Sequence, residues 1–239
     1  AHHLTIDGIG YTTLYANLSG TGNLTKNSTG TLTVIGVVDE RFEDRFTGQT
    51  FINDGELIQA SFNNDAPGVG PLDDFGINGN VTVGDGTGLA SSAKFTLGTN
   101  DSGAGTNFSN MIAGGVDMTI NSDGRLDTRG HTTYLQNITL DGGSINAQTG
   151  TSGGNDLFVT GDITSTHASQ TATIDGFLDF TNDATKTISV TGTSTLDINA
   201  RVQNGGIAKT GTGTLILSGG NTFEDDVDIQ AGIIRIDND

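Results

Sequence analysis

The same order of Gly, Lys, Thr and aliphatic residues occurs twice in this chain, with a long interval between the copies. The stretch GNLTKNSTGTLTVIG begins at Gly22 and the stretch GGIAKTGTGTLILSG begins at Gly205, an offset of 183 residues (205 minus 22). After an insertion in the first copy, FTGQTFINDGELI from Phe46 corresponds to FEDDVDIQAGIIR from Phe223. The matching positions form a candidate structural motif: Lys26, Gly30, Leu32, Gly36 and Gly55 in the first copy, and Lys209, Gly213, Leu215, Gly219 and Gly232 in the second. A pattern that recurs indicates a repeating scaffold rather than a single catalytic loop.

Apolar and polar residues alternate in short runs that end at Gly, Asn or Asp. Leu196 and Ile198 form one such apolar pair, and Leu215 and Leu217 form another. This period of two predicts strands that are buried on one face. No segment keeps a helical period over about ten residues, so we expect no helices between the strands. A chain without crossover helices can form a hairpin sandwich, a barrel or a solenoid, and the internal repetition favours the solenoid.

The second copy carries a specific resemblance. The pattern (Leu or Ile)-x-Lys-x-Gly-x-Gly-Thr-Leu-x-Leu-x-Gly, followed by Asn-Thr-Phe and a strand ending in Ala-Gly-Ile-Ile, resembles the passenger-associated repeat of bacterial autotransporters. The copy from Gly205 to Ile236 follows this pattern closely, except at residues 225–228, where the family usually has Thr-Gly-Gly-Thr. The first copy departs more, with Ser28 in place of a Gly. The resemblance implies a right-handed parallel β-helix that is extracellular and displayed on the bacterial cell surface.

We therefore predict an all-β fold, a right-handed parallel β-helix (β-solenoid) of about ten to twelve rungs. The segment 1–239 is expected to be a single solenoid. The family-like repeats cover about residues 20–59 and 203–239, looser rungs cover 60–202, and an insertion loop covers 37–46. Rungs that stack at ~4.8 Å would bury Leu, Ile, Val and Phe inside, and would place Thr and Asn outside.

The charge of the chain excludes several partners. Ten basic residues against 28 acidic residues give a formal net charge of −18. Such a surface repels phosphates and anionic membranes, so we expect no nucleic-acid partner. No apolar run approaches the ~20 residues that span a bilayer, so we expect no membrane insertion by this segment. Because the chain has no cysteine, its stability must come from repetitive burial rather than from disulfides.

One charged stretch, SDGRLDTRGH, is a candidate for chemistry. Its charged side chains alternate, so that several could share the outer face of one strand: Asp123, Arg125, Asp127, Arg129 and His131. Such a face suggests a polysaccharide lyase, in which carboxylates hold calcium and an Arg takes the substrate proton. A strand and turn without any catalytic role explains the same stretch and is favoured. The chain also lacks a Gly-x-Ser-x-Gly elbow, a Walker loop, HExxH and CxxC, so we expect no catalytic residues and no enzyme.

Calcium is the one cofactor that the sequence suggests, and it does so weakly. The stretch GGNDLFVTG from Gly153 looks like part of the calcium-binding nonapeptide GGxGxDxUx, but that motif works by stacking and here has no second copy. Asp225, Asp226 and Asp228 are weak candidates for a cation site. We expect no other cofactor.

The insertion in the first copy is the first candidate contact surface, since binding often lies on solenoid insertions. Its ligand would be a surface glycan or a host or cell molecule. The insertion carries five charged residues: Glu40, Arg41, Glu43, Asp44 and Arg45.

The main hypothesis is a non-enzymatic structural segment of an extracellular bacterial β-helix protein, namely a surface stalk, fibre or adhesin building block. An open β-helix end exposes unpaired backbone groups and core side chains, so we expect it to contact a neighbouring repeat or another copy, head to tail. Joining IDND to AHH would recreate the Asn-Asp-Ala of FNNDAP, which predicts one period of a longer tandem array. The alternative is a carbohydrate-binding or polysaccharide-cleaving β-helix protein with SDGRLDTRGH in its cleft. A third hypothesis is a calcium-stiffened spacer.

Overall fold

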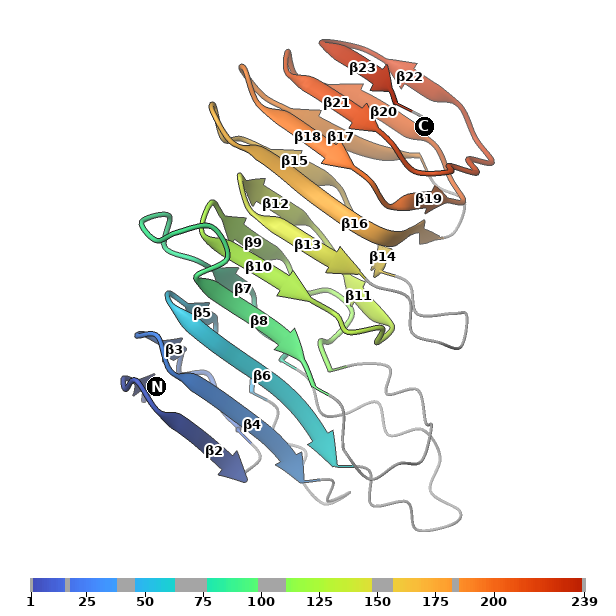
Figure 1. The fold of residues 1–239 in the computed structure, drawn as a ribbon. Coiled ribbons are helices and arrows are strands. Elements are labelled where there is room, and N and C mark those ends of the chain that lie inside the picture. Colours follow the sequence, from blue (N-terminus) through green and yellow to red (C-terminus); the bar gives the residue numbers. More distant parts are fainter. Residues whose placement is uncertain are drawn as a thin grey trace, which may run out of the picture.

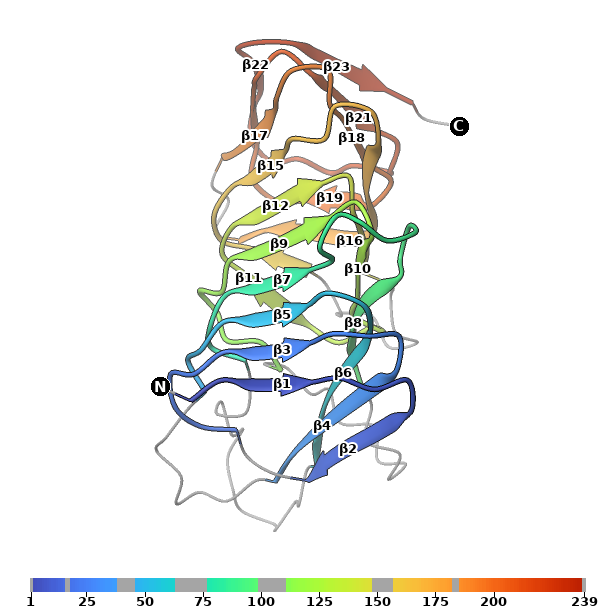
Figure 2. The same ribbon diagram turned by 90° about the vertical axis from the view of Figure 1, so that its left-hand side faces the viewer.

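In a computed structural model the chain winds into a parallel β-helix. The structure describes residues 2–15, 18–37, 46–62, 77–98, 111–147, 157–181 and 185–237, with the backbone alone at 36–37 and 61–62. Within these ranges it contains 23 strands, and all of the strand pairs are parallel. Figures 1 and 2 show the strands stacked in layers along one axis, with the two chain ends at opposite ends of the stack. The described residues contain no helix long and apolar enough to cross a membrane.

The rungs build two long sheets and one shorter sheet. The first sheet takes one strand from each of ten rungs: β1 (Leu4–Ile6), β3 (Leu24–Lys26), β5 (Thr50–Ile52), β7 (Val81–Val83), β9 (Met118–Asn121), β12 (Ile138–Asp141), β15 (Ile163–Ser165), β17 (Lys186–Val190), β20 (Ile207–Thr210) and β22 (Val227–Ile229). The second sheet takes the following strand of each rung: β2 (Tyr11–Tyr15), β4 (Thr31–Val37), β6 (Gly55–Phe62), β8 (Ala93–Leu97), β10 (Gly124–Asp127), β13 (Ser144–Ala147), β16 (Thr171–Phe180), β18 (Thr195–Ile198), β21 (Thr214–Leu217) and β23 (Ile233–Ile236). The third sheet contains β11 (Thr133–Leu135), β14 (Leu157–Val159), the end of β16, and β19 (Arg201–Gln203).

The predicted all-β parallel β-helix is therefore confirmed, and ten rungs cross both long sheets of the described structure. The rungs differ in length. Leu4 pairs with Leu24, 20 residues later, whereas Val81 pairs with Met118, 37 residues later (118 minus 81). Strand register is therefore kept while the connections between strands vary.

Inward side chains form continuous columns along the axis. Leu32, Leu57, Phe95 and Leu126 follow one another in register on β4, β6, β8 and β10, and each is 0% exposed. Each of these side chains packs against the equivalent side chain of the next rung. A period of two within each short strand is therefore sufficient to build a long apolar core.

Candidate functional site

The lysine of the second repeat is buried at a corner of the β-helix. Lys209 lies on β20, and its side chain is 0% exposed. Its Nζ donates hydrogen bonds to the carbonyl oxygens of Thr210 at 2.6 Å, Gly211 at 2.8 Å and Ala231 at 3.1 Å. Burial lowers the pKa of Lys209. The first two carbonyls belong to its own corner and the third to the next rung, so the side chain links two rungs.

The lysine of the first repeat occupies the equivalent corner. Lys26 lies on β3 and is 1% exposed. Its Nζ donates to the carbonyl oxygen of Ser28 in its own corner and to that of Asp54, 3.2 Å away in the next rung. Burial lowers the pKa of Lys26, against an opposing effect of the carboxylates of Asp54 and Asp7. Both repeats therefore use their lysine for structure, and neither lysine is available to a ligand.

Ser28, where the first repeat departs from the family pattern, is accommodated by the preceding rung. Its backbone has φ of 84°, a conformation that normally requires Gly. Its hydroxyl donates to the carbonyl oxygen of Gly8 and accepts from the N–H of Gly8, both at 2.8 Å. These two hydrogen bonds offset the backbone strain and keep the corner in place.

The repeat glycines lie where two backbones meet closely. Gly55 has φ of 70° and Gly232 has φ of 75°. A Cβ added at Gly55 would lie 2.3 Å from the carbonyl oxygen of Gly30, and one at Gly232 would lie 2.4 Å from that of Gly213. A Cβ at Gly219 would lie 2.2 Å from the carbonyl oxygen of Ala200. The glycine spacing that the two copies share thus serves the close stacking of corners.

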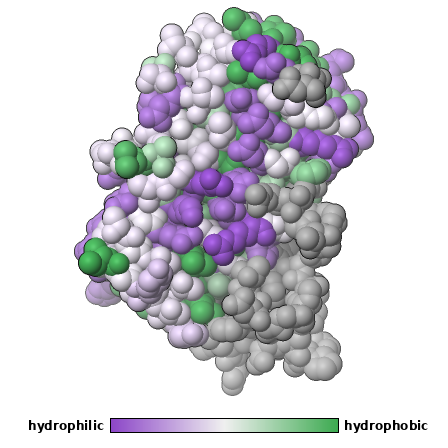
Figure 3. All heavy atoms as spheres, in the orientation of Figure 1, coloured by the Kyte–Doolittle hydropathy of each residue, from purple (hydrophilic) through white to green (hydrophobic). Residues whose placement is uncertain are grey.

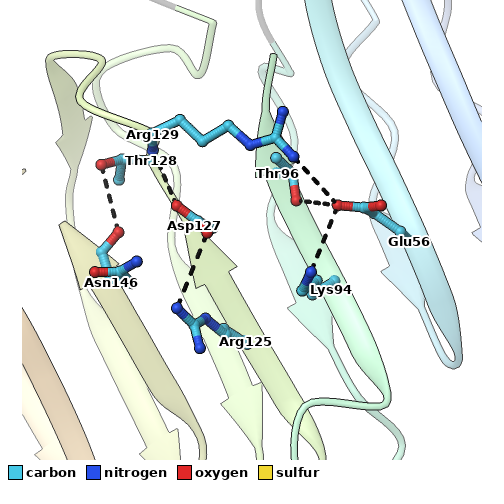
Figure 4. Close-up of polar contacts among 8 residues, drawn as sticks. All are labelled: Glu56, Lys94, Thr96, Arg125, Asp127, Thr128, Arg129 and Asn146. Atoms are coloured by element: carbon cyan, nitrogen blue, oxygen red, sulfur yellow. Dashed lines mark hydrogen bonds and ion pairs between the residues drawn. The ribbon is translucent and has the colours of Figure 1, made fainter. Parts of the chain in front are cut away.

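A cluster of charged side chains occupies the outer surface of the second long sheet; we call it the charged face. It comprises Glu56 on β6, Lys94 on β8, Arg125 and Asp127 on β10, and Arg129 two residues after the end of β10 (Figure 4). Glu56 pairs in register with Lys94, and Lys94 pairs with Arg125. Figure 3 shows hydrophilic side chains gathered across the middle of this sheet.

Glu56 organises one side of the charged face. Its Oε1 accepts a hydrogen bond of 2.6 Å from the hydroxyl of Thr96. The same oxygen lies 3.8 Å from Nζ of Lys94 and 3.9 Å from Nη2 of Arg129. The side chain of Glu56 is 22% exposed, so one partly buried carboxylate forms ion pairs with two cations from neighbouring rungs.

Arg125 is held less completely. Its Nη2 lies 3.9 Å from Oδ2 of Asp127, beyond hydrogen-bonding distance. Its Nε is buried and has no hydrogen-bond partner in the described structure. The guanidinium group therefore retains a donor, Nε, that no acceptor among the described residues satisfies.

Two residues of SDGRLDTRGH lie elsewhere. Asp123 is 0% exposed, and its carboxylate accepts hydrogen bonds from the N–H groups of Asp85 at 3.4 Å, Gly86 at 2.8 Å and Gly88 at 3.3 Å. It therefore anchors the loop between β7 and β8. His131 is 8% exposed. The five residues named from the sequence do not form one catalytic face.

Glu56 and Lys94 complete the charged face, and both were missed in the sequence. Each is a single charged residue in an alternating strand, with no motif around it. Only the register between rungs brings them beside Arg125.

The cation candidates are not assembled into a site. Among the described residues, no group of three or more His, Asp or Glu is placed to hold a metal ion, and this includes Asp225, Asp226 and Asp228. The Oδ2 of Asp228 instead accepts a hydrogen bond from Gln230 at 3.0 Å. Residues 153–156 of the nonapeptide-like stretch lie outside the described residues, as does the candidate contact loop with Glu40, Arg41, Glu43, Asp44 and Arg45.

Comparison with known proteins identifies the repeats. Residues 24–58 and 207–236 match the family model of the passenger-associated-transport-repeat. Both segments lie within the two copies predicted from the sequence, so the resemblance is confirmed. No curated protein and no solved structure matches the chain. The matched repeat is a structural repeat of secreted autotransporter passengers, and together with the parallel β-helix it supports a passenger-type structural segment.

Proposed function

We propose that this chain is a non-enzymatic structural segment of a bacterial autotransporter-type passenger, which extends from the cell surface as part of a stalk, fibre or adhesin. The observation that carries this proposal is that the residues of the repeat motif are used to join successive rungs. Lys26 and Lys209 are buried and bind carbonyl oxygens of two successive corners. Gly55 and Gly232 lie where a side chain would collide with the preceding rung. These residues hold rungs together and face no substrate.

The ends of the described stack are the proposed contact surfaces for further rungs. On β22 and β23 the inward positions remain open, with Ile229 53% and Ile236 58% exposed. They continue the columns of Lys209 and Leu217, their register partners on the preceding rung. We propose that a further rung covers them, from a neighbouring repeat of the same protein or from a second copy.

Surface labelling tests the location and role. Intact cells of the source bacterium would be treated with protease and probed with an antibody raised against this segment. Loss of the segment without cell lysis supports a surface stalk. A segment that stays protected until the cells are lysed contradicts it.

Electron microscopy of the purified segment over a concentration series tests contact between copies. Filaments should lengthen with concentration, and Ile236→Lys should abolish them because it places a charge in the apolar column of Ile198 and Leu217. Ile216→Lys is the matched control, since Ile216 pairs with the outward residues Asp197 and Arg235. Short uniform rods at every concentration would contradict assembly from separate copies and leave a neighbouring repeat as the partner.

A further inference from the structure

We propose that the charged face binds a saccharide that carries a single carboxylate, such as a terminal uronic acid residue. The carboxylate would lie between Lys94 and Arg125, with Arg129 beside it. This is a binding activity in addition to the structural role proposed above, and it does not depend on that role.

The first observation is a pair of like charges on neighbouring strands. Lys94 and Arg125 are direct register partners on β8 and β10, so their backbones lie ~4.8 Å apart. Like charges placed directly opposite each other destabilise a sheet. The chain has 28 acidic residues but only ten basic ones, yet two of the ten are adjacent here. The carboxylates paired with them, Glu56 and Asp127, lie at 3.8 and 3.9 Å, so neither cation is hydrogen-bonded in its ion pair, and an anion between the two cations would offset their repulsion.

The second observation is the incomplete bonding of Arg125. Its Nε has no hydrogen-bond partner among the described residues, and its Nη2 reaches Asp127 only at 3.9 Å. Nε itself is buried, but the side chain as a whole is 35% exposed, so a ligand would approach the terminal Nη groups. The planar fork of an arginine matches a carboxylate through two parallel hydrogen bonds.

The third observation is that Arg129 is held in place by the protein. Its φ of 47° is unfavourable for a residue other than Gly, and its N–H donates a hydrogen bond of 3.1 Å to Oδ1 of Asp127. From this turn its side chain extends back across β8 to Glu56 (Figure 4). Glu56 also pairs with Lys94 at 3.8 Å, so one carboxylate keeps two of the three cations on the same part of the face.

The surroundings favour a sugar rather than a simple anion. The column that contains Arg125 continues along the sheet with Ser144 and Thr173, whose side chains are partly exposed. Their hydroxyls are suited to the hydroxyl groups of a sugar ring. The net charge of −18 repels long polyanions. The charged face itself holds three cations and two carboxylates, Glu56 and Asp127, which leaves a local excess of one positive charge (three minus two). One ligand carboxylate matches this excess, whereas the further carboxylates of a polyuronate would have no cation to meet.

A matched pair of disaccharides tests the proposal. Cellobiouronic acid ends in one glucuronate, and cellobiose is its uncharged counterpart. We expect cellobiouronic acid to bind the protein at least tenfold more tightly than cellobiose in calorimetric or NMR titrations, and its affinity to fall as salt is raised. Equal affinity for the two disaccharides would overturn the role of the carboxylate. If acetate bound as tightly as cellobiouronic acid, the proposal that the ligand is a saccharide would be wrong. Tighter binding of a polyuronate would overturn the restriction to a single carboxylate.

Variants localise the site. Arg125→Gln and, separately, Lys94→Gln should each weaken binding of cellobiouronic acid by roughly tenfold. Arg201→Gln is the matched control, because Arg201 is an exposed arginine on β19 of the third sheet and should leave affinity unchanged. Full affinity in both Gln variants, or equal loss in the Arg201 control, would overturn the assignment. Unchanged thermal unfolding of a variant shows that its loss of affinity is not a loss of fold. The surface-labelling experiment tests the structural role independently, so either proposal can fail without the other.

Discussion

The ammonium group of Lys209 donates a hydrogen bond of 3.1 Å to the carbonyl oxygen of Ala231, which belongs to the next rung of the β-helix. The same group donates to Thr210 and Gly211 in its own corner. A buried charge is tolerated only where several dipoles compensate it, and three carbonyl oxygens do so here. This geometry explains why the repeat places its lysine two residues before the turn.

Replacing Lys209 by Met should destabilise the last rungs. The variant keeps most of the side-chain volume but leaves three carbonyl oxygens without their donor, a loss of about 2–4 kcal/mol. Denaturant unfolding together with amide exchange in β22 and β23 would measure it. Lys94→Met is the control, because Lys94 is 39% exposed and its removal should cost less than about 0.5 kcal/mol. Equal losses in the two variants would contradict a linking role for Lys209.

The buried lysines should also make stability depend on alkaline pH. Burial lowers the pKa of Lys26 and Lys209 below the ordinary value of 10.5. Between the lowered pKa and 10.5 the unfolded chain binds more protons than the folded chain, so the unfolding free energy contributed by these groups rises with pH. Below the lowered pKa both states are protonated and the contribution is constant.

Comparing wild type with the Lys26→Met/Lys209→Met double variant isolates this effect. Between the lowered pKa and 10.5, wild type should gain unfolding free energy relative to the double variant as the pH rises. A relative loss over the same range would mean that the carbonyl contacts favour the charged form more than burial disfavours it.

Ser28 offers a test in which two substitutions of one residue should differ. Ser28→Ala loses both hydrogen bonds to Gly8 and keeps φ of 84°, so it should cost about 1–2 kcal/mol. Ser28→Gly loses the same bonds but relieves the backbone strain, so its stability should stay within about 0.5 kcal/mol of wild type. Thermal unfolding of the two variants decides the matter. An Ala variant as stable as the Gly variant would show that the strain at this corner is negligible.

Much of the fold could be predicted from the sequence, because each strand carries its own information. Leu32 lies between Thr31 and Thr33, and Leu215 lies between Thr214 and Ile216. Both leucines point inward and are 0% exposed, as the period of two requires. The duplicated lysines also behave as equivalent positions. The pairing of residues between neighbouring rungs could not be predicted from the pattern alone. A long connection adds residues to a rung without adding a strand, so the sequence distance between paired strands varies.

The charged face shows the consequence of that limit. Glu56 and Lys94 are 38 positions apart, and Lys94 and Arg125 are 31 apart, yet they are successive register partners. Nothing local in the sequence reports such neighbours. The alternating pattern also wrongly predicted that Asp123 shares the outer face of the strand. Asp123 precedes β10, and its carboxylate accepts a hydrogen bond from the N–H of Gly86 in the loop between β7 and β8.

Gly55 should tolerate no side chain. A Cβ there would lie 2.3 Å from the carbonyl oxygen of Gly30 and 2.4 Å from that of Ser28, at φ of 70°. Backbone atoms cannot move aside as a side chain can, so Gly55→Ala should combine the strain of a left-handed residue with displacement of the neighbouring rung, a cost above about 2 kcal/mol. Gly220→Ala is the matched control, because a Cβ there would meet no described heavy atom within 4 Å. Denaturant midpoints of the two variants should differ clearly; if they coincide, the close approach of the corners does not constrain the repeat, and its glycines would need another explanation.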